Sequence, residues 1–301
     1  MAEISVTPGR NRRAPAVFVG VDGSERNRPA VRWATREAAR AHTELRLLAV
    51  ASEATILPHQ LTREGALDSL VAETRALVER VHKETLPTWD QVTVEVLTGH
   101  PAQALRRPLQ PGDVLVLGRG GRGAVERALV GSTSLQVAGR ADDPCVVVPD
   151  DWDEDAHVGQ AIVAGVDWTE RDAPVLDFAF ARAAALGVPL AVVGAWWAPR
   201  QRSWELTPDD TEYEADLARH IAAWSDRYPG VVLDVSVPVR RAGDALLAAA
   251  RDSQLVVLGR HARLGAHGRF SAFSTCREVL QHATCPVAIV PTGRIGDTRD
   301  E

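Results

Sequence analysis

The fold is decided by one run of sequence, Val114-Leu115-Val116-Leu117-Gly118-Arg119-Gly120-Gly121. In this run four apolar residues are followed directly by a glycine-rich turn. Such an apolar run is typical of a buried strand. Ten residues after Gly121 comes Gly131-Ser132, where a helix is expected to begin. A strand that ends in glycines and leads to a helix brings backbone N–H groups together, and such groups bind phosphate. The spacing Gly-x2-Gly-x9-Gly-Ser therefore predicts a phosphate site.

The chain contains the same unit twice. Gly20-Val21-Asp22 returns as Gly165-Val166-Asp167, and the strand that leads into Gly118-Arg119 returns before Gly259-Arg260. Both units close on a cysteine and an apolar run, Cys145-Val146-Val147-Val148-Pro149 and Cys285-Pro286-Val287-Ala288-Ile289-Val290-Pro291, in which the cysteines are taken as equivalent. We therefore expect two domains of about 140 residues. The expected division is a flexible tail at 1–14, domain 1 at 15–149, a solvated acidic linker at 150–157, domain 2 at 158–292 and a tail at 293–301.

Strand and helix patterns alternate within each unit. In the first unit strands are expected at residues 16–21, 45–50, 92–97, 114–117 and 145–148, with helices after a capping Asn27 and at 67–81, 102–107 and 132–140. This alternation predicts an α/β fold, a doubly wound, mostly parallel sheet that is covered on both faces. Ligands bind such sheets beyond the carboxyl ends of the strands, where the strand order reverses. Asp22 and the Gly118 loop are therefore expected to face one crevice.

These motifs resemble those of a tandem universal stress protein of the ATP-binding branch. The resemblance covers nearly the whole chain and rests on the glycine spacing, the Gly20-Val21-Asp22-Gly23-Ser24 turn and the closing strands. It implies two flavodoxin-like or Rossmann-like domains, packed as a pseudo-two-fold pair through the strands at 145–148 and 285–290. It also implies a cytoplasmic, dimer-forming nucleotide sensor in a stress or growth-arrest response.

The resemblance also implies the site. Gly118, Gly121, Gly131 and Ser132 would hold phosphates and ribose, the backbone of Val50 would bind adenine, and Asp22 would lie near the phosphates and Mg2+. Arg119 and Arg122 would add positive charge. The full set expected to bind ATP and Mg2+ is Gly20, Asp22, Val50, Gly118, Arg119, Gly121, Arg122, Gly131, Ser132 and Thr133, with Asp22 as the metal ligand.

Composition excludes several other classes of protein. The net charge of −6 argues against a nucleic-acid partner, and no apolar run approaches the ~20 residues that span a bilayer. The three cysteines form no metal-ligand spacing, which favours a reducing cytosol. Of the 34 lysines and arginines only Lys83 is a lysine, and it is remote from any glycine-rich turn. A Walker-type loop or a kinase-type site cannot be built without a nearby lysine.

The second unit departs from the pattern. Ala262 stands in place of Gly121, and counting back from Cys285 places Ser271-Ala272 at Gly131-Ser132, while Trp168 follows Asp167. A Cβ narrows the space for a phosphate, so we expect domain 2 not to bind ATP in the family's manner and to be structural or regulatory. Its basic loop, Arg260, His261, Arg263, His267 and Arg269, could hold another anion or be solvated. Trp196, Trp197 and Trp204 could form a lid or cover the junction between the units.

Two alternatives to a nucleotide sensor remain open at this point. One is a slow ATPase or autophosphorylating protein, for which Asp22 or Asp113 could position water. The other is a nucleotide-free scaffold that uses the fold only for dimerisation. Binding is favoured over turnover because the sequence offers no lysine clamp for a transition state. The protein partner, the oligomeric state of the tandem chain and the choice among adenine nucleotides are left open.

Overall fold

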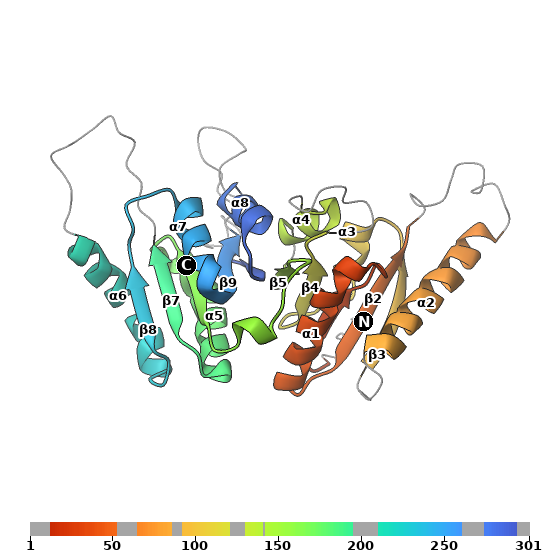
Figure 1. The fold of residues 1–301 in the computed structure, drawn as a ribbon, viewed down its shortest axis with the longest axis horizontal. Coiled ribbons are helices and arrows are strands. Elements are labelled where there is room, and N and C mark those ends of the chain that lie inside the picture. Colours follow the sequence, from red (N-terminus) through yellow and green to blue (C-terminus); the bar gives the residue numbers. More distant parts are fainter. Residues whose placement is uncertain are drawn as a thin grey trace, which may run out of the picture.

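The computed structural model describes residues 13–52, 65–85, 92–120, 130–140, 142–194, 210–260 and 274–293. Within them two α/β domains follow one another, and their strands form one ten-stranded sheet in the order β3-β2-β1-β4-β5-β10-β9-β6-β7-β8. Figure 1 shows the two domains side by side, with the closing strands at the centre. The expected fold class is confirmed.

Domain 1 is built from alternating strands and helices, as the sequence predicts. Its elements are β1 (Val17–Gly20), α1 (Arg28–Arg40), β2 (Leu45–Ala51), α2 (Ala66–Thr85), β3 (Val92–Thr98), α3 (Pro101–Ala104), β4 (Val114–Gly118), α4 (Ser132–Ala138) and β5 (Cys145–Val148). All neighbouring strands in this domain are parallel. The strand order reverses between β1 and β4, so the carboxyl ends of these two strands form the expected crevice.

Domain 2 repeats the arrangement. Its elements are β6 (Ala161–Val166), α5 (Ala173–Leu186), β7 (Leu190–Gly194), α6 (Asp210–Arg227), β8 (Leu233–Ser236), α7 (Ala242–Ala249), β9 (Ser253–Arg260), α8 (Ser274–His282) and β10 (Val287–Pro291). These strands are also parallel to their neighbours within the domain.

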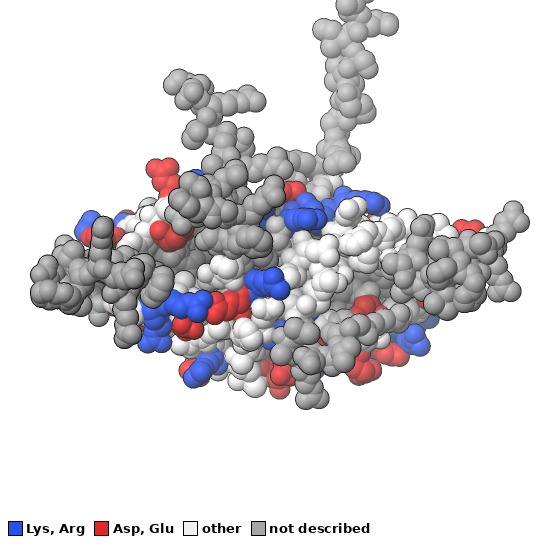
Figure 2. Space-filling view, turned by 90° about the horizontal axis from the view of Figure 1, so that it is seen from above, with Lys and Arg blue, Asp and Glu red and all other residues white. Residues whose placement is uncertain are grey.

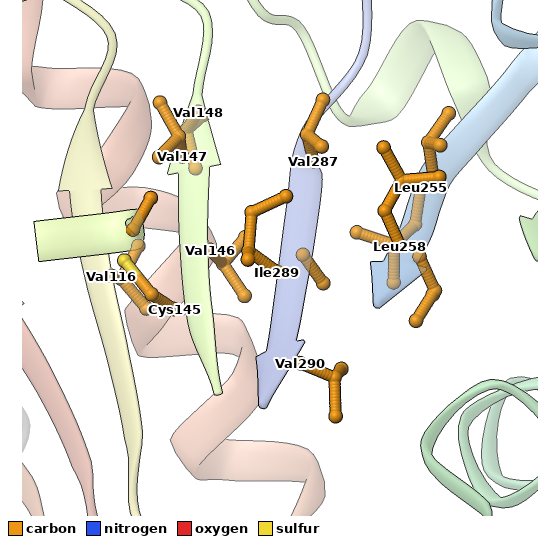
Figure 3. Close-up of a cluster of buried hydrophobic side chains, with 14 of the residues drawn as sticks. Val116, Cys145, Val146, Val147, Val148, Leu255, Leu258, Val287, Ile289 and Val290 are labelled. Atoms are coloured by element: carbon orange, nitrogen blue, oxygen red, sulfur yellow. The ribbon is translucent and has the colours of Figure 1, made fainter. Parts of the chain in front are cut away.

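The closing strands join the domains, as expected. β5 and β10 pair antiparallel, with Val146 opposite Ala288 and with Cys145 opposite Ile289. Figure 3 shows the two strands side by side, with buried side chains that continue from β5 across β10 toward β9. The pairing is symmetric about Val146 and Ala288, because each domain contributes equivalent residues on either side of them. The two cores are therefore continuous across a pseudo-two-fold axis.

The cysteines of the closing strands are not equivalent, which corrects the alignment expected from the sequence. The carbonyls of Pro144 and Pro286 accept the same ladder hydrogen bond in the two domains, so Cys145 is equivalent to Val287. Cys285 lies two positions before Val287. Burial raises the pKa of Cys145 to about 12 and that of Cys285 to about 11. Both thiols therefore remain protonated and act as small core residues.

Two residues of the acidic segment between the domains, Trp152 and Glu154, pack against domain 1, while Asp151, Asp153 and Asp155 are exposed to solvent. Glu154 forms ion pairs with two arginines of α1, at 3.6 Å to Arg36 and 2.6 Å to Arg40. Trp152 is buried and stacks on His157, with ring centroids 4.1 Å apart. The acidic residues are thus matched to the basic outer face of α1, because several carboxylates in one segment need counter-charges.

Candidate functional site

The crevice of domain 1 begins at the turn that follows β1. Asp22 is half-buried there, and its Oδ1 accepts hydrogen bonds from the backbone N–H and the hydroxyl of Ser24, at 2.9 and 2.7 Å. Gly23 has a φ of +75°, which side chains rarely adopt. This turn holds the carboxylate at the carboxyl edge of the sheet, where a ligand can reach it.

Hydrogen bonds join the two halves of the glycine motif. The N–H of Gly131 donates to the carbonyl of Arg119, and the hydroxyl of Ser134 donates to the carbonyl of Gly118, both at 2.7 Å. The start of α4 is therefore held against the end of β4. Because the N–H of Gly131 is used within this scaffold, the amides that this helix end can offer to a ligand belong to Ser132 and Thr133.

Asn27 lies between the ends of β1 and β4 instead of capping α1. Its amide Nδ2 donates to the carbonyl of Gly20 at 3.0 Å, and its side chain makes no cap hydrogen bond to α1. A Cβ on Gly118 would lie 3.2 Å from this nitrogen. Asn27 thus fixes the spacing of the two strand ends and accounts for the glycine at 118. Nothing in the sequence indicates this role, and the equivalent position in domain 2 carries an aspartate, Asp172.

Gly20 also serves the scaffold of the crevice. A Cβ at this position would lie 2.6 Å from the side chain of Leu117 on the neighbouring strand. A Cβ at position 20 would therefore displace the Leu117 side chain, and the carbonyl of Gly20 is the one that Asn27 binds.

Arg119 reaches the other domain with its side chain. Its Nη1 donates to the carbonyl of Ala283 at 2.7 Å, and its backbone N–H donates to the carbonyl of Val148 at 2.7 Å. The guanidinium therefore stabilises the junction between the domains, where the sequence suggested added charge for phosphate. Gly121 and Arg122, also expected in the site, lie outside the described residues.

Val50 lies where the sequence placed it, near the carboxyl end of β2. The ladder between β1 and β2 ends with Gly20 opposite Leu48, two residues before Val50. On its other side Val50 is paired with Leu97 of β3. Its position beyond the end of β1 is compatible with a ligand that enters along this edge, and its contact with adenine stays a prediction.

Asp113 lies at the other end of β4, away from the crevice. It precedes Val114, is fully buried, and accepts hydrogen bonds from Arg13 at 2.7 Å, the N–H of Ala16 at 2.9 Å and the N–H of Gln110 at 2.6 Å. This carboxylate is a structural acceptor, so the suggestion that it positions water is wrong. It also anchors Arg13, which the sequence assigned to the flexible tail.

Comparison with known proteins assigns the family. The model of the universal stress protein family matches residues 15–149 and 160–291. The chain belongs to the universal stress protein family. A universal stress protein of Mycobacterium tuberculosis is 32% identical over 302 residues, covering 91% of this chain and 94% of the relative. One from Mycolicibacterium smegmatis is 30% identical, covering 91% and 96%.

A solved structure has the same fold over nearly the whole chain. A universal stress protein from Archaeoglobus fulgidus matches with a TM-score of 0.67 and 18% identity, covering 92% of this chain and 96% of that chain. A second universal stress protein from Archaeoglobus fulgidus, solved in complex with dAMP, matches 44% of this chain with a TM-score of 0.34 and 26% identity. In the described part of our universal stress protein, no helix has the length and apolar character needed to cross a membrane.

The crevice of domain 2 in this universal stress protein contains an indole. Trp168 occupies the position equivalent to Gly23 and keeps its left-handed backbone, with a φ of +60°. A Cβ on Gly194, the last residue of β7, would lie 2.4 Å from Nε1 of Trp168. The indole therefore rests on the carboxyl end of β7, at the edge where the nucleotide is expected in domain 1.

The start of α8 also differs from that of α4. Cys276 Sγ donates to the carbonyl of Gly259 at 3.4 Å, as Ser134 does to Gly118, so residues 134 and 276 are equivalent. Position 273, a phenylalanine, is then the equivalent of Gly131. This corrects the alignment of Gly131 with Ser271. Positions 261–273, which include Ala262, lie outside the described residues.

Domain 2 carries a buried carboxylate where domain 1 has Asn27. Asp172 is fully buried and accepts the N–H of Thr169 at 2.9 Å and that of Asp167 at 3.3 Å. Its Oδ2 lies 3.4 Å from Nε2 of His220 on α6. Burial, followed by the nearby charge of Asp167, raises the pKa of Asp172 despite the backbone hydrogen bonds. A buried carboxylate at this position, where domain 1 has a neutral amide, disfavours an anion nearby.

Replacing Asp172 with asparagine, the residue found at the equivalent position in domain 1, is expected to change the melting temperature by an amount that depends on pH. Asparagine keeps only one of the two oxygens that accept backbone N–H groups, but it is neutral at every pH. A carboxyl whose pKa is raised by folding loses stability as pH increases above its unfolded pKa, about 4. The melting temperature of Asp172→Asn relative to that of the wild type should therefore be higher at pH 7.5 than near pH 4. Thermal unfolding at the two pH values checks this, and a relative melting temperature that does not rise with pH would contradict it.

Proposed function

We propose that this universal stress protein is a nucleotide-dependent sensor that binds ATP with Mg2+ in domain 1. One observation supports this most directly: hydrogen bonds from Gly131 and Ser134 hold both halves of the glycine motif together, at the carboxyl edge that also carries Asp22. Backbone N–H groups and a half-buried carboxylate at the reversal of strand order suit a nucleotide and its metal ion.

The residues present fit ATP and Mg2+. Mg2+ commonly binds one or two protein carboxylates together with phosphate oxygens, and Asp22 offers one carboxylate at the crevice. The described residues hold no group of three His, Cys, Asp or Glu side chains placed for a metal. Phosphate oxygens and water would supply the remaining ligands. Ser132 and Thr133 offer amides and hydroxyls to the phosphates, and the backbone of Val50 offers hydrogen bonds to adenine.

Domain 2 is proposed to be structural or regulatory. Trp168 covers Gly194 at its crevice, Asp172 places a buried carboxylate beneath, and the equivalent of Gly131 is Phe273. Each change removes space or favourable charge from a phosphate site. We therefore expect one ATP per chain.

Binding is proposed to act through the segment between Gly118 and Gly131, of which residues 121–129 lie outside the described residues. A ligand shifts an equilibrium only if it binds one state better than another, so a partner must distinguish the ATP-bound arrangement of this segment. Turnover is not part of this proposal, because Asp113 lies at the far end of β4 and Lys83, the one lysine, is remote in sequence from the glycine motif. We place this sensor in the cytoplasm, with a protein partner that remains to be identified.

The test is calorimetric titration of the full chain with ATP, in the presence and absence of Mg2+. Asp22→Asn keeps an acceptor for Ser24 but removes the charge, so we expect affinity for MgATP to fall about tenfold or more, with little change for ATP alone. The matched control is Asp167→Asn, the equivalent change in domain 2, which should leave binding unchanged. Binding of two ATP molecules per chain would overturn the role of domain 2, and no binding by nucleotide-free protein would overturn the proposal.

A further inference from the structure

A second recess lies at the junction of the two domains. Its volume is about 530 Å3, and it is lined by Arg106, Gly139, Arg140 and Asp142 of domain 1 and by Arg260, Pro291 and Gly293 of domain 2. It shares no lining residue with the crevice of domain 1. A ligand in this recess would contact both domains at once.

The antiparallel closing strands create this recess. Because β5 and β10 run in opposite directions, the carboxyl end of β10 lies beside the segment that leads into β5. Pro291 at the end of β10 is paired with Arg260 at the end of β9. Arg140 and Asp142 come from the segment between α4 and β5, and they face these strand ends across the recess.

Positive charge predominates in the recess, with three arginines against one aspartate. Arg106 Nη2 lies 3.3 Å from Asp142 Oδ2, but Asp142 is 80% exposed, so this pair is hydrated and weak. Nε of Arg106 is buried and has no hydrogen-bond partner among the described residues. Among the described residues, Arg140 also forms no ion pair. Among the described residues, Arg106 and Arg140 therefore have fewer acceptors than their guanidinium N–H groups could bind.

The fold does not require this charge, because the pseudo-symmetric copy of the recess lacks it. Leu105 and Leu246 contact Gly20 and Gly165 in the same way, so Arg106 is equivalent to Leu247. The strand registers identify the residues of the copy that are equivalent to the other lining residues. These are His282 for Arg140, Thr284 for Asp142, Arg119 for Arg260 and Asp151 for Gly293. In that copy the single arginine, Arg119, lies 3.7 Å from Asp151 and donates to Ala283. Arg260 and Arg119 are thus common to the two copies, and Arg106 and Arg140 are the arginines that only one of them carries.

We propose that the recess binds a small phosphate-bearing anion with more than one negative charge, and that this ligand bridges the domains. Guanidinium groups match phosphate oxygens in charge and in bidentate geometry. The volume lies within the range of small-molecule pockets, which favours a free ligand over a macromolecule. Figure 2 shows basic and acidic side chains interleaved on the face it presents, without the extended basic field that a nucleic acid would need.

Calorimetric titration of the full chain with inorganic pyrophosphate at low salt tests this proposal. The variant Arg106→Leu with Arg140→His carries the residues of the pseudo-symmetric copy, which the same fold accommodates. We expect its dissociation constant to rise about a hundredfold, tenfold for each arginine. Arg32→Leu with Arg75→His makes the same change of net charge at exposed positions and should bind as the wild type does.

The same variants separate this recess from the proposed nucleotide site. The Arg106, Arg140 variant should bind MgATP normally, and Asp22→Asn should bind pyrophosphate normally. If pyrophosphate does not bind to the wild type, or binds equally well to the recess variant, the proposal is overturned. Far-ultraviolet circular dichroism confirms folding, and Arg140→His alone, a change at an exposed residue, must weaken binding about tenfold even if the double variant is unstable.

Discussion

Replacing Arg182 with alanine is expected to lower the free energy of unfolding by about 3–5 kcal/mol, because it leaves a buried carboxylate without its partner. Arg182 on α5 forms an ion pair with Glu37 on α1, and the two side chains are only 9% and 13% exposed. Its guanidinium also lies over the ring of Trp33, 4.7 Å from the centroid. Burial lowers the pKa of Arg182 to about 9, which still leaves it charged at pH 7.

The pair spans the pseudo-two-fold axis between equivalent positions. Residue 37 of domain 1 and residue 182 of domain 2 occupy the same place in the repeated unit, as do Trp33 and Phe178. In a symmetric dimer of one unit, such a position would face a copy of itself with like charge. The two halves of this chain carry opposite charges at this position. Each half is therefore complementary in charge to the other half and not to a second copy of itself.

Exchanging the charges tests this interpretation. The double variant Glu37→Arg with Arg182→Glu places the arginine over Phe178, so we expect it to recover most of the stability that either alanine variant loses. Recovery should be incomplete, because a cation binds the ring of Phe less strongly than that of Trp. The control is Arg219→Ala, which removes a pair whose arginine is 76% exposed and should cost below about 1 kcal/mol. Urea unfolding measures all four, and an exchange variant no more stable than the single variants would contradict the interpretation.

The sequence predicts the architecture well because it depends on repeated local patterns. Apolar runs, glycines at strand ends and the duplication are each visible without tertiary contacts, and they lead to the fold and to the pairing of β5 with β10. Alignment of the two units by their cysteines failed, because equivalence is set by the ladder at Pro144 and Pro286 and not by residue identity.

The side chains around the crevice were less predictable, because each has a partner that is distant in the chain. Arg119 lies in a glycine-rich motif that suggests phosphate, yet it donates to Ala283, 164 residues away. Asn27 has the residue type of a helix cap, yet it binds Gly20. The indole of Trp168 contacts Gly194, a placement that depends on the left-handed turn of the backbone. Residue types predict the chemistry available, while the topology decides where it is used.

Replacing Asp113 with alanine is expected to lower the free energy of unfolding by about 3 kcal/mol without a direct effect on nucleotide binding. This fully buried carboxylate accepts the N–H groups of Ala16 and Gln110 and pairs with Arg13, so its loss leaves buried donors without acceptors. Arg13 is 21% exposed and can be hydrated in part, which limits the cost.

Asparagine at 113 separates the charge from the hydrogen bonds. Its carbonyl oxygen can still accept the N–H of Ala16, so Asp113→Asn should cost about half as much as alanine. Urea unfolding measures both losses, and MgATP titration of the folded variants should match the wild type, since Asp113 precedes β4 while the crevice follows it. A variant that unfolds like the wild type but loses an ATP-dependent activity would instead indicate that Asp113 takes part in the reaction. The expected pattern, a large loss of stability with unchanged binding, assigns this carboxylate to attaching the segment before β1 to the start of β4.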